Sequence, residues 1–249
     1  MNFVAIIPAR FASTRFPGKP LALLGGKYVI QHVYEQVCKA LDQVYVATDS
    51  QLIYDAVVRF GGKAIMTSPD HHSGTDRASE ALDKIDGCYD VVVNVQGDEP
   101  FIQSSQIRTV MDAFNDPSTQ IATLAKRFDS IEEVENPNSP KIVVDNDGFA
   151  LYFSRSPIPF IRGKNRAEWL SSYPFLKHIG LYAYRADVLQ EVTRLQQSTL
   201  ELAESLEQLR WLQNGYKIKV GLTTIETVGI DTPADLQKAE LLLLSNSIK

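Results

Sequence analysis

Short apolar runs alternate with helical segments over the first half of the chain, and this alternation constrains the fold more than any other feature. Residues Phe3–Ile7 are stopped by Pro8, and runs of strand character recur at 44–47, 63–66 and 90–95. Segments with apolar residues three and four positions apart separate these runs, which is typical of amphipathic helices. Because strands that alternate with helices pair in parallel through right-handed crossovers, the pattern predicts an α/β fold with a mostly parallel sheet and helices on both faces. The helices expected here span residues 28–41, 50–60, 75–85 and 103–114.

The pattern changes after about residue 120, where antiparallel pairing enters. Residues 141–144 and 149–153 predict a hairpin, because Asp145-Asn146-Asp147-Gly148 between them is a turn sequence. Residues 157–174 contain three prolines and predict an irregular excursion that is mobile or reaches a partner subunit. The other elements expected are strands at 121–128 and 175–184, a helical turn at 131–135, extended stretches at 218–222 and 224–226, and helices at 186–195, 199–212 and 233–244. Thr232 is a candidate cap for the last helix.

Composition excludes several classes of protein. With 249 residues, 44% hydrophobic content and a net charge of −5, the chain lacks the basic excess of a general nucleic-acid binder. No apolar window is long enough to span a membrane and no signal peptide precedes the first strand, so we expect a cytoplasmic protein without membrane contact. Cys38 and Cys88 lie far apart, which argues against a disulfide framework or a zinc site.

A cationic loop follows the first strand. Arg10, Arg15, Lys19 and Lys27 are the only charged residues among the first 34, which carry +4, whereas the remaining chain carries −9. A basic loop at the carboxyl end of the first strand of an α/β sheet predicts an anionic ligand, and we infer a polyphosphate. Neither the P-loop motif nor the dinucleotide fingerprint is present, so a kinase or an NAD-binding protein is disfavoured. The alternative is a surface loop that is basic by chance.

Two aspartates are candidate ligands for a divalent cation. Asp98 follows the strongest apolar run, 90–95, and Asp231 lies in Gly229-Ile230-Asp231-Thr232-Pro233 before the last helix. A polyphosphate held by arginine and lysine normally needs a hard cation with oxygen ligands as well. Alone, Asp231 is also typical of a turn or a helix cap. Glu99 either faces solvent or binds metal.

Other polar residues support binding more weakly. Ser73 and Arg77 lie at a helix start that suits nucleotide contacts, although such sequences are also common caps. Arg155 follows a hairpin strand and is a candidate bidentate clamp for a substrate carboxylate, or else a salt-bridge partner at the rim. His178 alternates with apolar residues, which is usual for a structural histidine. His71 and His72 lack neighbouring ligands for a transition metal.

Seven blocks in order carry a resemblance to a known family: IIPARFASTRFPGKPL, HHSGTDR, NVQGDEP, ALYFSRSPIP, KHIGLYAYR, LEQLRWL and GIDTP. Together they resemble the bacterial 3-deoxy-manno-octulosonate cytidylyltransferases, also called CMP-Kdo synthetases. The resemblance implies a Rossmann-like nucleotidyltransferase fold with an antiparallel sugar-binding and dimerisation lobe, and a homodimer. It implies a Mg²⁺-dependent enzyme that forms CMP-Kdo and pyrophosphate from CTP and the sugar acid Kdo, for lipopolysaccharide synthesis.

The resemblance also implies a role for individual positions. The triphosphate loop would be Arg10, Ser13, Arg15 and Lys19, with Ser73 and Arg77 near the nucleotide. Asp98 and Asp231 would hold magnesium, and together with Arg10 and Lys19 they would be the catalytic residues. The sugar acid would be bound by Gln96, Arg155, His178, Tyr182, Glu207 and Gln208. We expect one domain whose parts are the CTP-binding half (about 1–120), the sugar-binding lobe (about 121–228) and the metal ligand with the C-terminal helix (about 229–249).

The chemistry implied is attack of the anomeric hydroxyl of Kdo on the α-phosphorus of CTP, with pyrophosphate as the leaving group. No strong protein base is evident in the sequence, so we hypothesise that the metal lowers the pKa of the hydroxyl. Two alternatives stay open at this point. The substrate could be 8-amino-Kdo or another 2-keto-3-deoxy sugar acid, since selectivity at one substituent can rest on a single contact. Alternatively, the chain could be a non-catalytic nucleotide-sugar binding module on the same fold.

Overall fold

The computed structural model describes residues 1–12 and 15–246. The chain divides into two compact units: unit 1 comprises residues 1–108 and 227–249, and unit 2 comprises residues 109–226. Within the described part of the chain, no helix is both long and apolar enough to cross a membrane. The mixed α/β architecture with a mostly parallel sheet and surrounding helices confirms the predicted fold class.

The strands of the main sheet in unit 1 pair in parallel. β1 (Phe3–Ala9) pairs with β4 (Val44–Thr48) on one side and with β6 (Val91–Asn94) on the other, and β5 (Ala64–Met66) pairs with β4. β1 and β6 are central because their residues are apolar on both faces and almost fully buried. The chain leaves β1 toward β4 and β5 and then returns to the opposite side of β1 as β6. This reversal creates a topological switch point beyond the carboxyl ends of β1 and β6.

Helices in unit 1 bury one apolar face each. α1 (Val29–Val37), for example, has Val29, Ile30, Val33 and Val37 fully buried, as its predicted periodicity requires. The remaining helices that include unit 1 residues are α2 (Gln51–Arg59), α3 (Gly74–Lys84), α4 (Ser104–Asp112) and α10 (Pro233–Asn246). α4 continues past residue 108, where unit 1 ends.

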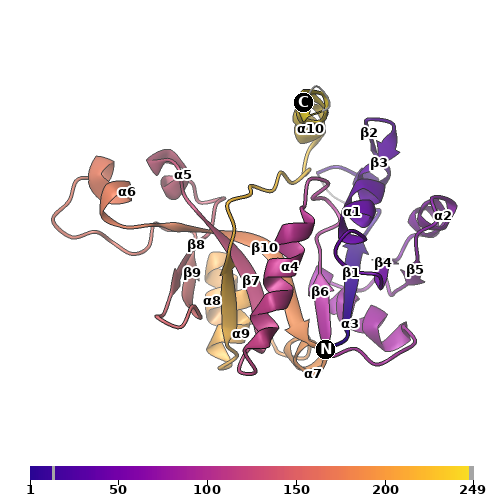
Figure 1. Cartoon of the computed structure of the whole chain (residues 1–249), viewed down its shortest axis with the longest axis horizontal. Helices are drawn as coiled ribbons and strands as arrows, with labels where there is room; N and C mark the ends of the chain where they lie inside the picture. The colour runs from indigo at the N-terminus through magenta and orange to yellow at the C-terminus, as the bar shows by residue number, and fades with distance from the viewer. Residues whose placement is uncertain (13–14, 247–249) are drawn as a thin grey trace. The chain divides into compact units, whose positions relative to one another are not determined.

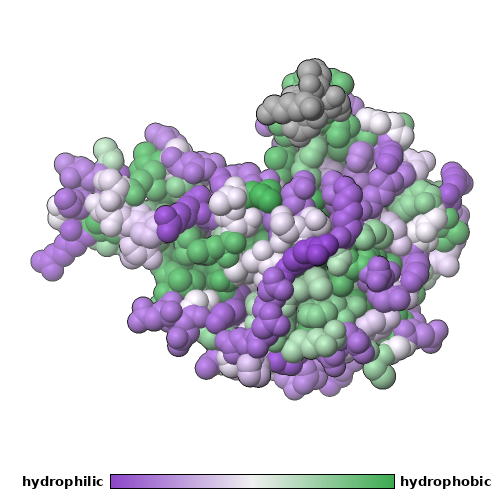
Figure 2. All heavy atoms as spheres, in the orientation of Figure 1, coloured by the Kyte–Doolittle hydropathy of each residue, from purple (hydrophilic) through white to green (hydrophobic). Residues whose placement is uncertain are grey.

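The C-terminal helix α10 packs on elements that the sequence pattern did not predict. These are a 3₁₀ turn at Lys19–Leu21 and a small hairpin of β2 (Leu23–Leu24) and β3 (Lys27–Tyr28). Figure 1 places α10 beside this hairpin, and the two share an apolar cluster with the start of α1. Apolar residues of α10 also reach the surface, as the green spheres over this helix show (Figure 2), and Leu241 and Leu244 are exposed.

Unit 2 combines parallel and antiparallel strands. β7 (Ile121–Arg127) pairs in parallel with β11 (Ile218–Leu222) and antiparallel with β10 (Leu176–Arg185). The predicted hairpin is present as β8 (Lys141–Val144) and β9 (Ala150–Ser154), and β8 also pairs with β10. Antiparallel pairing in this part of the chain is therefore confirmed. The helices within unit 2 are α5 (Ile131–Glu135), α6 (Trp169–Ser172), α7 (Ala186–Val192), α8 (Thr199–Glu204) and α9 (Gln208–Gln213).

Two expectations for unit 2 are wrong. The single helix predicted over 199–212 is broken into α8 and α9, because Ser205 has a left-handed backbone (φ 51°) that ends α8. Residues 157–174 are not irregular throughout, since they contain a 3₁₀ turn at Arg166–Glu168 followed by α6. Trp169 of α6 is buried and stacks on Phe175, which gives this segment an apolar anchor that its proline content did not reveal.

Candidate functional site

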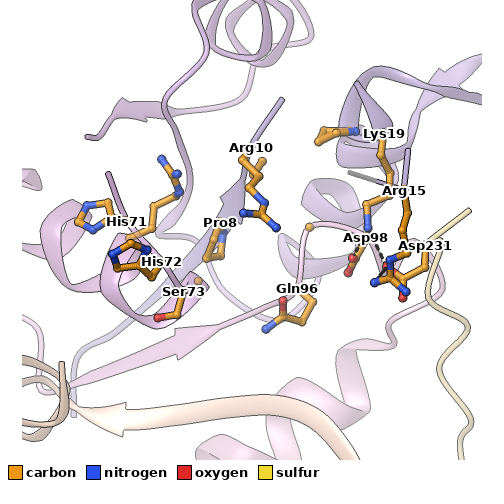
Figure 3. Close-up of a pocket in the computed structure, with 15 residues that line it drawn as sticks. Pro8, Arg10, Arg15, Lys19, His71, His72, Ser73, Gln96, Asp98 and Asp231 are labelled. Carbon is orange, nitrogen blue, oxygen red and sulfur yellow. Dashed lines mark hydrogen bonds and ion pairs between the residues drawn. The ribbon is translucent and has the colours of Figure 1, made fainter. Parts of the chain in front are cut away.

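A cavity of about 300 Å³ in unit 1 lies at the switch point of its sheet. The lining residues come from the ends of β1 and β6, the cationic loop, the start of α3 and the segment before α10. In Figure 3, Pro8 and Gln96 lie between two groups, with His71, His72 and Ser73 on one side and Lys19, Asp98, Arg15 and Asp231 on the other. The lining comprises Pro8, Ala9, Arg10, Arg15, Lys19, Pro20, His71, His72, Ser73, Gly74, Arg77, Gln96, Gly97, Asp98 and Asp231.

Lys19 joins the two predicted metal ligands. Its Nζ lies 2.5 Å from Oδ2 of Asp98 and 3.2 Å from Oδ1 of Asp231, and only 13% of its side chain is exposed. Arg15 also contacts Asp231, at 3.1 Å (Figure 3), but 67% of the Arg15 side chain and 49% of the Asp231 side chain are exposed. Both carboxylates therefore face one point, although Asp98 and Asp231 are 133 residues apart in the sequence.

Local backbone structure places these groups. The N–H of Gly18 donates to the carbonyl of Phe11 (2.9 Å), which closes the cationic loop, and Gly18 has the positive φ (71°) that glycine adopts without cost. Lys19 then opens the 3₁₀ turn. The N–H of Ile230 donates to the carbonyl of Asp98 (2.9 Å), and this bond holds the segment containing Asp231 against the end of β6.

Of two further predicted members of the cationic loop, Arg10 is described by the structure and Ser13 is not. Arg10 lines the cavity and is exposed, and its guanidinium makes no hydrogen bond or ion pair with any described residue. It is thus available to an anionic ligand. Ser13 lies outside the described residues, so its predicted role stays a prediction.

At the start of α3, Ser73 and Arg77 both line the cavity but are occupied by the protein itself. The hydroxyl of Ser73 accepts from the N–H of Asp76 (3.1 Å), so Ser73 caps the helix. Arg77 is 3% exposed, and its guanidinium donates to Thr67 Oγ1 (2.6 Å) and to Asp49 Oδ2 (3.1 Å). Nucleotide contacts from these two residues remain predicted.

The loop before α3 is held by Glu80. Its carboxylate accepts from the N–H of Ser68 (2.8 Å), pairs with Lys84 (2.6 Å) and contacts Nε2 of His71. Burial opposes ionisation of this carboxyl, but the hydrogen bonds from Lys84, Ser68 and His71 prevail and lower its pKa to about 2. Because Glu80 stays ionised, it fixes the loop that presents His71 and His72 to the cavity.

Glu99 has an environment unlike that of Asp98. It is partly buried, does not line the cavity, and burial together with the charge of Asp98 raises its pKa to about 8. A carboxyl that is largely protonated at neutral pH is a poor partner for a cation.

Two of the predicted sugar-binding residues, His178 and Tyr182, lie side by side in unit 2. The ring of His178 lies 5.4 Å from that of Tyr182, and its Nε2 is 3.1 Å from Oγ1 of Thr123. This hydroxyl donates to a strand carbonyl, since Leu181 O is 2.9 Å away, so it accepts from Nε2–H of His178 and fixes the tautomer. Tyr182 Oη and Gln208 Nε2 are buried without a hydrogen-bond partner in the described chain.

Burial makes this unit 2 group electrically neutral. Loss of solvent lowers the pKa of His178 to about 3 and raises the pKa of Tyr182 well above its usual value. At neutral pH the imidazole and the phenol are therefore both uncharged. Buried polar atoms without partners, such as Tyr182 Oη and Gln208 Nε2, are uncommon in folded proteins.

Arg155 and Glu207 also belong to unit 2. The guanidinium of Arg155 donates to three backbone carbonyls, those of Glu204 (2.6 Å), Pro137 (2.9 Å) and Ser205 (3.2 Å). These contacts are with backbone carbonyls, so they form neither a rim salt bridge nor a carboxylate clamp. Each of the two terminal nitrogens of Arg155 has a second N–H that these bonds do not use. Glu207 accepts from Arg210 (3.2 Å). The substrate roles of Arg155 and Glu207 stay predictions.

The cytidylyltransferase family model matches residues 4–218, most of the chain. A 3-deoxy-manno-octulosonate cytidylyltransferase of Bacteroides thetaiotaomicron is 62% identical, over 99% of this chain and 100% of its own length. The protein of the same name from Phocaeicola vulgatus is 63% identical over 98% of each chain. The chain belongs to the 3-deoxy-manno-octulosonate cytidylyltransferase family.

Solved structures agree with this family assignment. A CMP:2-keto-3-deoxy-manno-octonic acid synthetase complexed with CTP is 44% identical, with a TM-score of 0.91, and covers 99% of this chain and 100% of its own. A 4-diphosphocytidyl-2C-methyl-D-erythritol synthase from Anaerococcus prevotii, at 15% identity, has a TM-score of 0.63 over 98% of this chain and 99% of its own. The latter likeness concerns the fold alone.

Among the cavity residues of this family member, Gly97 was not predicted. A Cβ at this position would lie 2.6 Å from the carbonyl oxygen of Pro8, so no larger residue fits between β1 and the turn after β6. The signal was present in the block NVQGDEP, where glycine directly precedes Asp98. His71 and His72 also line the cavity, although they were considered only as transition-metal ligands.

The donor set of this family member, two carboxylates, fits a hard divalent cation such as magnesium. Asp98 and Asp231 offer carboxylate oxygens that already share one cation, Lys19, and Mg²⁺ is commonly held by one or two carboxylates together with substrate phosphates. Across residues 1–12 and 15–246, no group of three or more histidine, cysteine, aspartate or glutamate side chains is placed to hold a metal.

Proposed function

We propose that this protein is a Mg²⁺-dependent enzyme that transfers the cytidylyl group of CTP to Kdo, giving CMP-Kdo and pyrophosphate for lipopolysaccharide synthesis. Family membership supports the reaction class. The observation that supports this reaction for the present chain is that Lys19, Asp98 and Asp231 meet in one cavity. The relatives' substrate and the CTP of the 44% identical structure support the choice of ligands.

The triphosphate is assigned to the cationic loop. Arg10 lines the cavity without an ion-pair partner among the described residues, while Arg15 and Lys19 can exchange their aspartate contacts for phosphate oxygens. Such an exchange costs little because one anionic partner replaces another. Together with Ser13, which belongs to the same loop, these residues would hold the phosphates, and Ser73 and Arg77 would border the nucleoside.

Asp98 and Asp231 are assigned to magnesium. The bound ion would neutralise charge on the phosphoryl oxygens and lower the pKa of the attacking hydroxyl. The protein would place the carboxylates of Asp98 and Asp231 side by side, and Lys19 would exchange its contacts with them for contacts with the phosphates. Arg10 and Lys19 would stabilise the negative charge that develops on the transferred group.

The predicted sugar-binding residues of unit 2 are assigned to Kdo. Tyr182 and Gln208 offer buried polar atoms without partners, and His178 offers a neutral ring. A sugar acid has several hydroxyls that can satisfy such groups, and an analogue lacking one of them would leave a buried atom unpaired. Arg155 and Glu207 complete the set, Arg155 through the hydrogen atoms that its backbone contacts leave free.

The reaction forms a bond between the anomeric oxygen of Kdo and the α-phosphorus, and it breaks the bond from that phosphorus to the bridging oxygen of pyrophosphate. The hydroxyl proton passes to solvent. Positioning supplies much of the rate enhancement, because holding two reactants in line replaces a bimolecular encounter.

The test is pyrophosphate release by the purified protein with Mg²⁺, CTP and one of three sugar acids: Kdo, 8-amino-Kdo or N-acetylneuraminate. We expect turnover with CTP and Kdo, none with the other nucleoside triphosphates and none in EDTA. Turnover with another sugar acid would reassign the substrate. Binding of CTP without turnover on any pair would favour a non-catalytic module.

A homodimer is also part of the proposal. On the segment that carries α6, Phe160 is 75% exposed and packs edge-on against Trp169, which places an apolar side chain at the surface of unit 2. A second copy of the chain would cover it. Light scattering should give twice the monomer mass, and Phe160→Asp should give a monomer.

We place the reaction in the cytoplasm, where CTP is available.

A further inference from the structure

Asp235, in the first turn of α10, contacts the backbone of a cavity residue without lining the cavity itself. Its Oδ2 accepts three hydrogen bonds, from the N–H of Asp231 (3.3 Å), the N–H of Thr232 (3.0 Å) and the hydroxyl of Thr232 (2.8 Å). In return, Thr232 Oγ1 accepts from the N–H of Asp235 (3.3 Å). This reciprocal pair is a capping box, so the predicted cap at Thr232 is confirmed.

The segment before α10 has no regular structure to hold it. Residues 223–232 form neither helix nor strand, so the backbone position of Asp231 depends on individual hydrogen bonds. One is on its amino-terminal side, where the N–H of buried Ile230 donates to the carbonyl of Asp98. The other contacts are those of Asp235. Residue 231 is thus fixed relative to β6 by Ile230 and relative to α10 by Asp235.

α10 is itself well anchored. Ala239 is fully buried in the cluster that contains Ile230, Leu24 and Val29, and Phe16 of the cationic loop packs against the same cluster. The helix therefore links the segment that carries Asp231 to the loop that carries Lys19 and Arg15. A contact that ties Asp231 to α10 ties it to its partners in the cavity.

We propose that Asp235 is a positioning residue that holds Asp231 in register with Asp98, and thereby tunes the affinity of the site for the magnesium complex of CTP. The inference rests on the proposed function, in which the two aspartates bind that ion. Loss of a hydrogen-bonding partner behind a metal ligand typically costs about 10- to 100-fold in affinity or activity.

The geometry offers a discriminating pair of variants. All three donors bond to one oxygen of Asp235, and the other oxygen faces only Lys238, at 3.7 Å, whose side chain is 73% exposed. Asp235→Asn can keep its amide oxygen in the place of Oδ2 and retain the three bonds without the charge. Asp235→Ala loses both. Two controls are Lys238→Ala, which removes the exposed pair, and Ser130→Ala, which removes the cap of α5.

The experiment measures Mg–CTP affinity by calorimetry without sugar, together with kcat, KM and the thermal midpoint. We expect Asp235→Ala to bind Mg–CTP about 10-fold more weakly with lower kcat, and Asp235→Asn to restore most of both. Both controls should bind as the wild type does, although Ser130→Ala should also lower the thermal midpoint. A merely structural role for Asp235 would lower the midpoint of Asp235→Ala and leave affinity unchanged.

Two results would overturn the proposal: wild-type affinity in Asp235→Ala, or an Asp235→Asn variant as weak as Asp235→Ala, which would mean that the charge itself binds the ion. If Asp235→Ala does not fold, Thr232→Val, which removes one donor and the reciprocal acceptor, should weaken Mg–CTP binding several-fold, and wild-type affinity in that variant would overturn the proposal equally. If the wild type binds Mg–CTP but releases no pyrophosphate with any sugar acid, the proposed function fails while these affinities still decide the role of Asp235.

Discussion

The polar residues of the unit 1 cavity differ in charge and in hydrogen bonding from the buried residues His178, Tyr182 and Gln208 of unit 2. In unit 1, Lys19, Asp98 and Asp231 are charged and paired with one another. In unit 2, His178 and Tyr182 are neutral, and Tyr182 Oη and Gln208 Nε2 have no partner in the described chain. One site therefore stores its charges as internal ion pairs, whereas the other leaves neutral hydrogen-bonding atoms unsatisfied.

The difference fits the two ligands that we propose. A triphosphate and a metal ion bring large charges, and preformed ion pairs balance the charges of Lys19, Asp98 and Asp231 until these ligands exchange with them. A sugar acid brings mostly hydroxyls, and atoms that lack partners favour a ligand able to supply them. Changes in unit 1 should accordingly affect turnover most, and changes in unit 2 should affect sugar affinity and acid stability.

The largest effect is expected for Asp98→Asn. The amide keeps the shape of the side chain but removes the charge that Lys19 and the proposed magnesium ion need, so kcat should fall about 10²- to 10³-fold. Pyrophosphate release under saturating CTP measures it. Asp116→Asn, which alters an equivalent pair with Lys219 in unit 2, should have near-normal turnover. Near-normal turnover of Asp98→Asn in Mg²⁺ would contradict the assignment.

Gly97→Ala should come next. The new methyl group would lie 2.6 Å from the Pro8 carbonyl, so β1 and the turn carrying Asp98 must separate. Overpacking of this kind costs about 1–3 kcal/mol of unfolding free energy, and CTP affinity should fall with it. Gly229→Ala is the matched control, because a Cβ there meets nothing within 4 Å. Equal thermal midpoints for the two variants would show that the contact is relieved without cost.

Acid should destabilise the fold through His178. The folded pKa is about 3 and the usual value is 6.5, so the unfolded chain binds the proton first. The contribution of the neutral His178 ring to the free energy of unfolding is fully present above pH 6.5 and is lost as the pH falls toward 3. The loss is about 1–2 kcal/mol at pH 5, since the ring keeps some contact with solvent.

Urea unfolding at pH 7 and pH 5 tests this. His178→Gln can still donate to Thr123 from its amide and should show a smaller loss between the two pH values than the wild type does. His72→Gln, at an exposed position, should lose as much as the wild type. An equal loss in His178→Gln and the wild type would exclude His178 as the titrating group.

Tyr182→Phe should have the smallest effect on the fold. Its hydroxyl is buried without a partner among the described residues, so removing it should leave the thermal midpoint unchanged or slightly higher. The KM for Kdo should rise about 5- to 10-fold, which corresponds to one net hydrogen bond of about 1 kcal/mol. Tyr216→Phe, whose hydroxyl bonds to Glu191 at 2.9 Å, should lower stability without changing the KM. An unchanged KM in Tyr182→Phe would remove this residue from the sugar site.

The sequence alone determined the elements that local patterns encode. Apolar runs placed β1, β4, β6 and β7 to within about two residues, and their alternation with helices predicted a mostly parallel sheet with the cationic loop at the carboxyl end of its first strand. The helix break at Ser205 and the anchor at Trp169 escaped because propensity in 199–212 favours one helix and prolines in 157–174 hide an apolar contact.

Only the tertiary structure decided which side chains meet. Lys19 bridges Asp98 and Asp231 across 79 and 212 residues of sequence, and no local pattern carries that distance. Arg77 was predicted to contact a nucleotide, yet its guanidinium donates hydrogen bonds to Thr67 and Asp49 of the protein itself. Composition and periodicity show which interactions each side chain is capable of, whereas the packing of distant segments determines which of these interactions form.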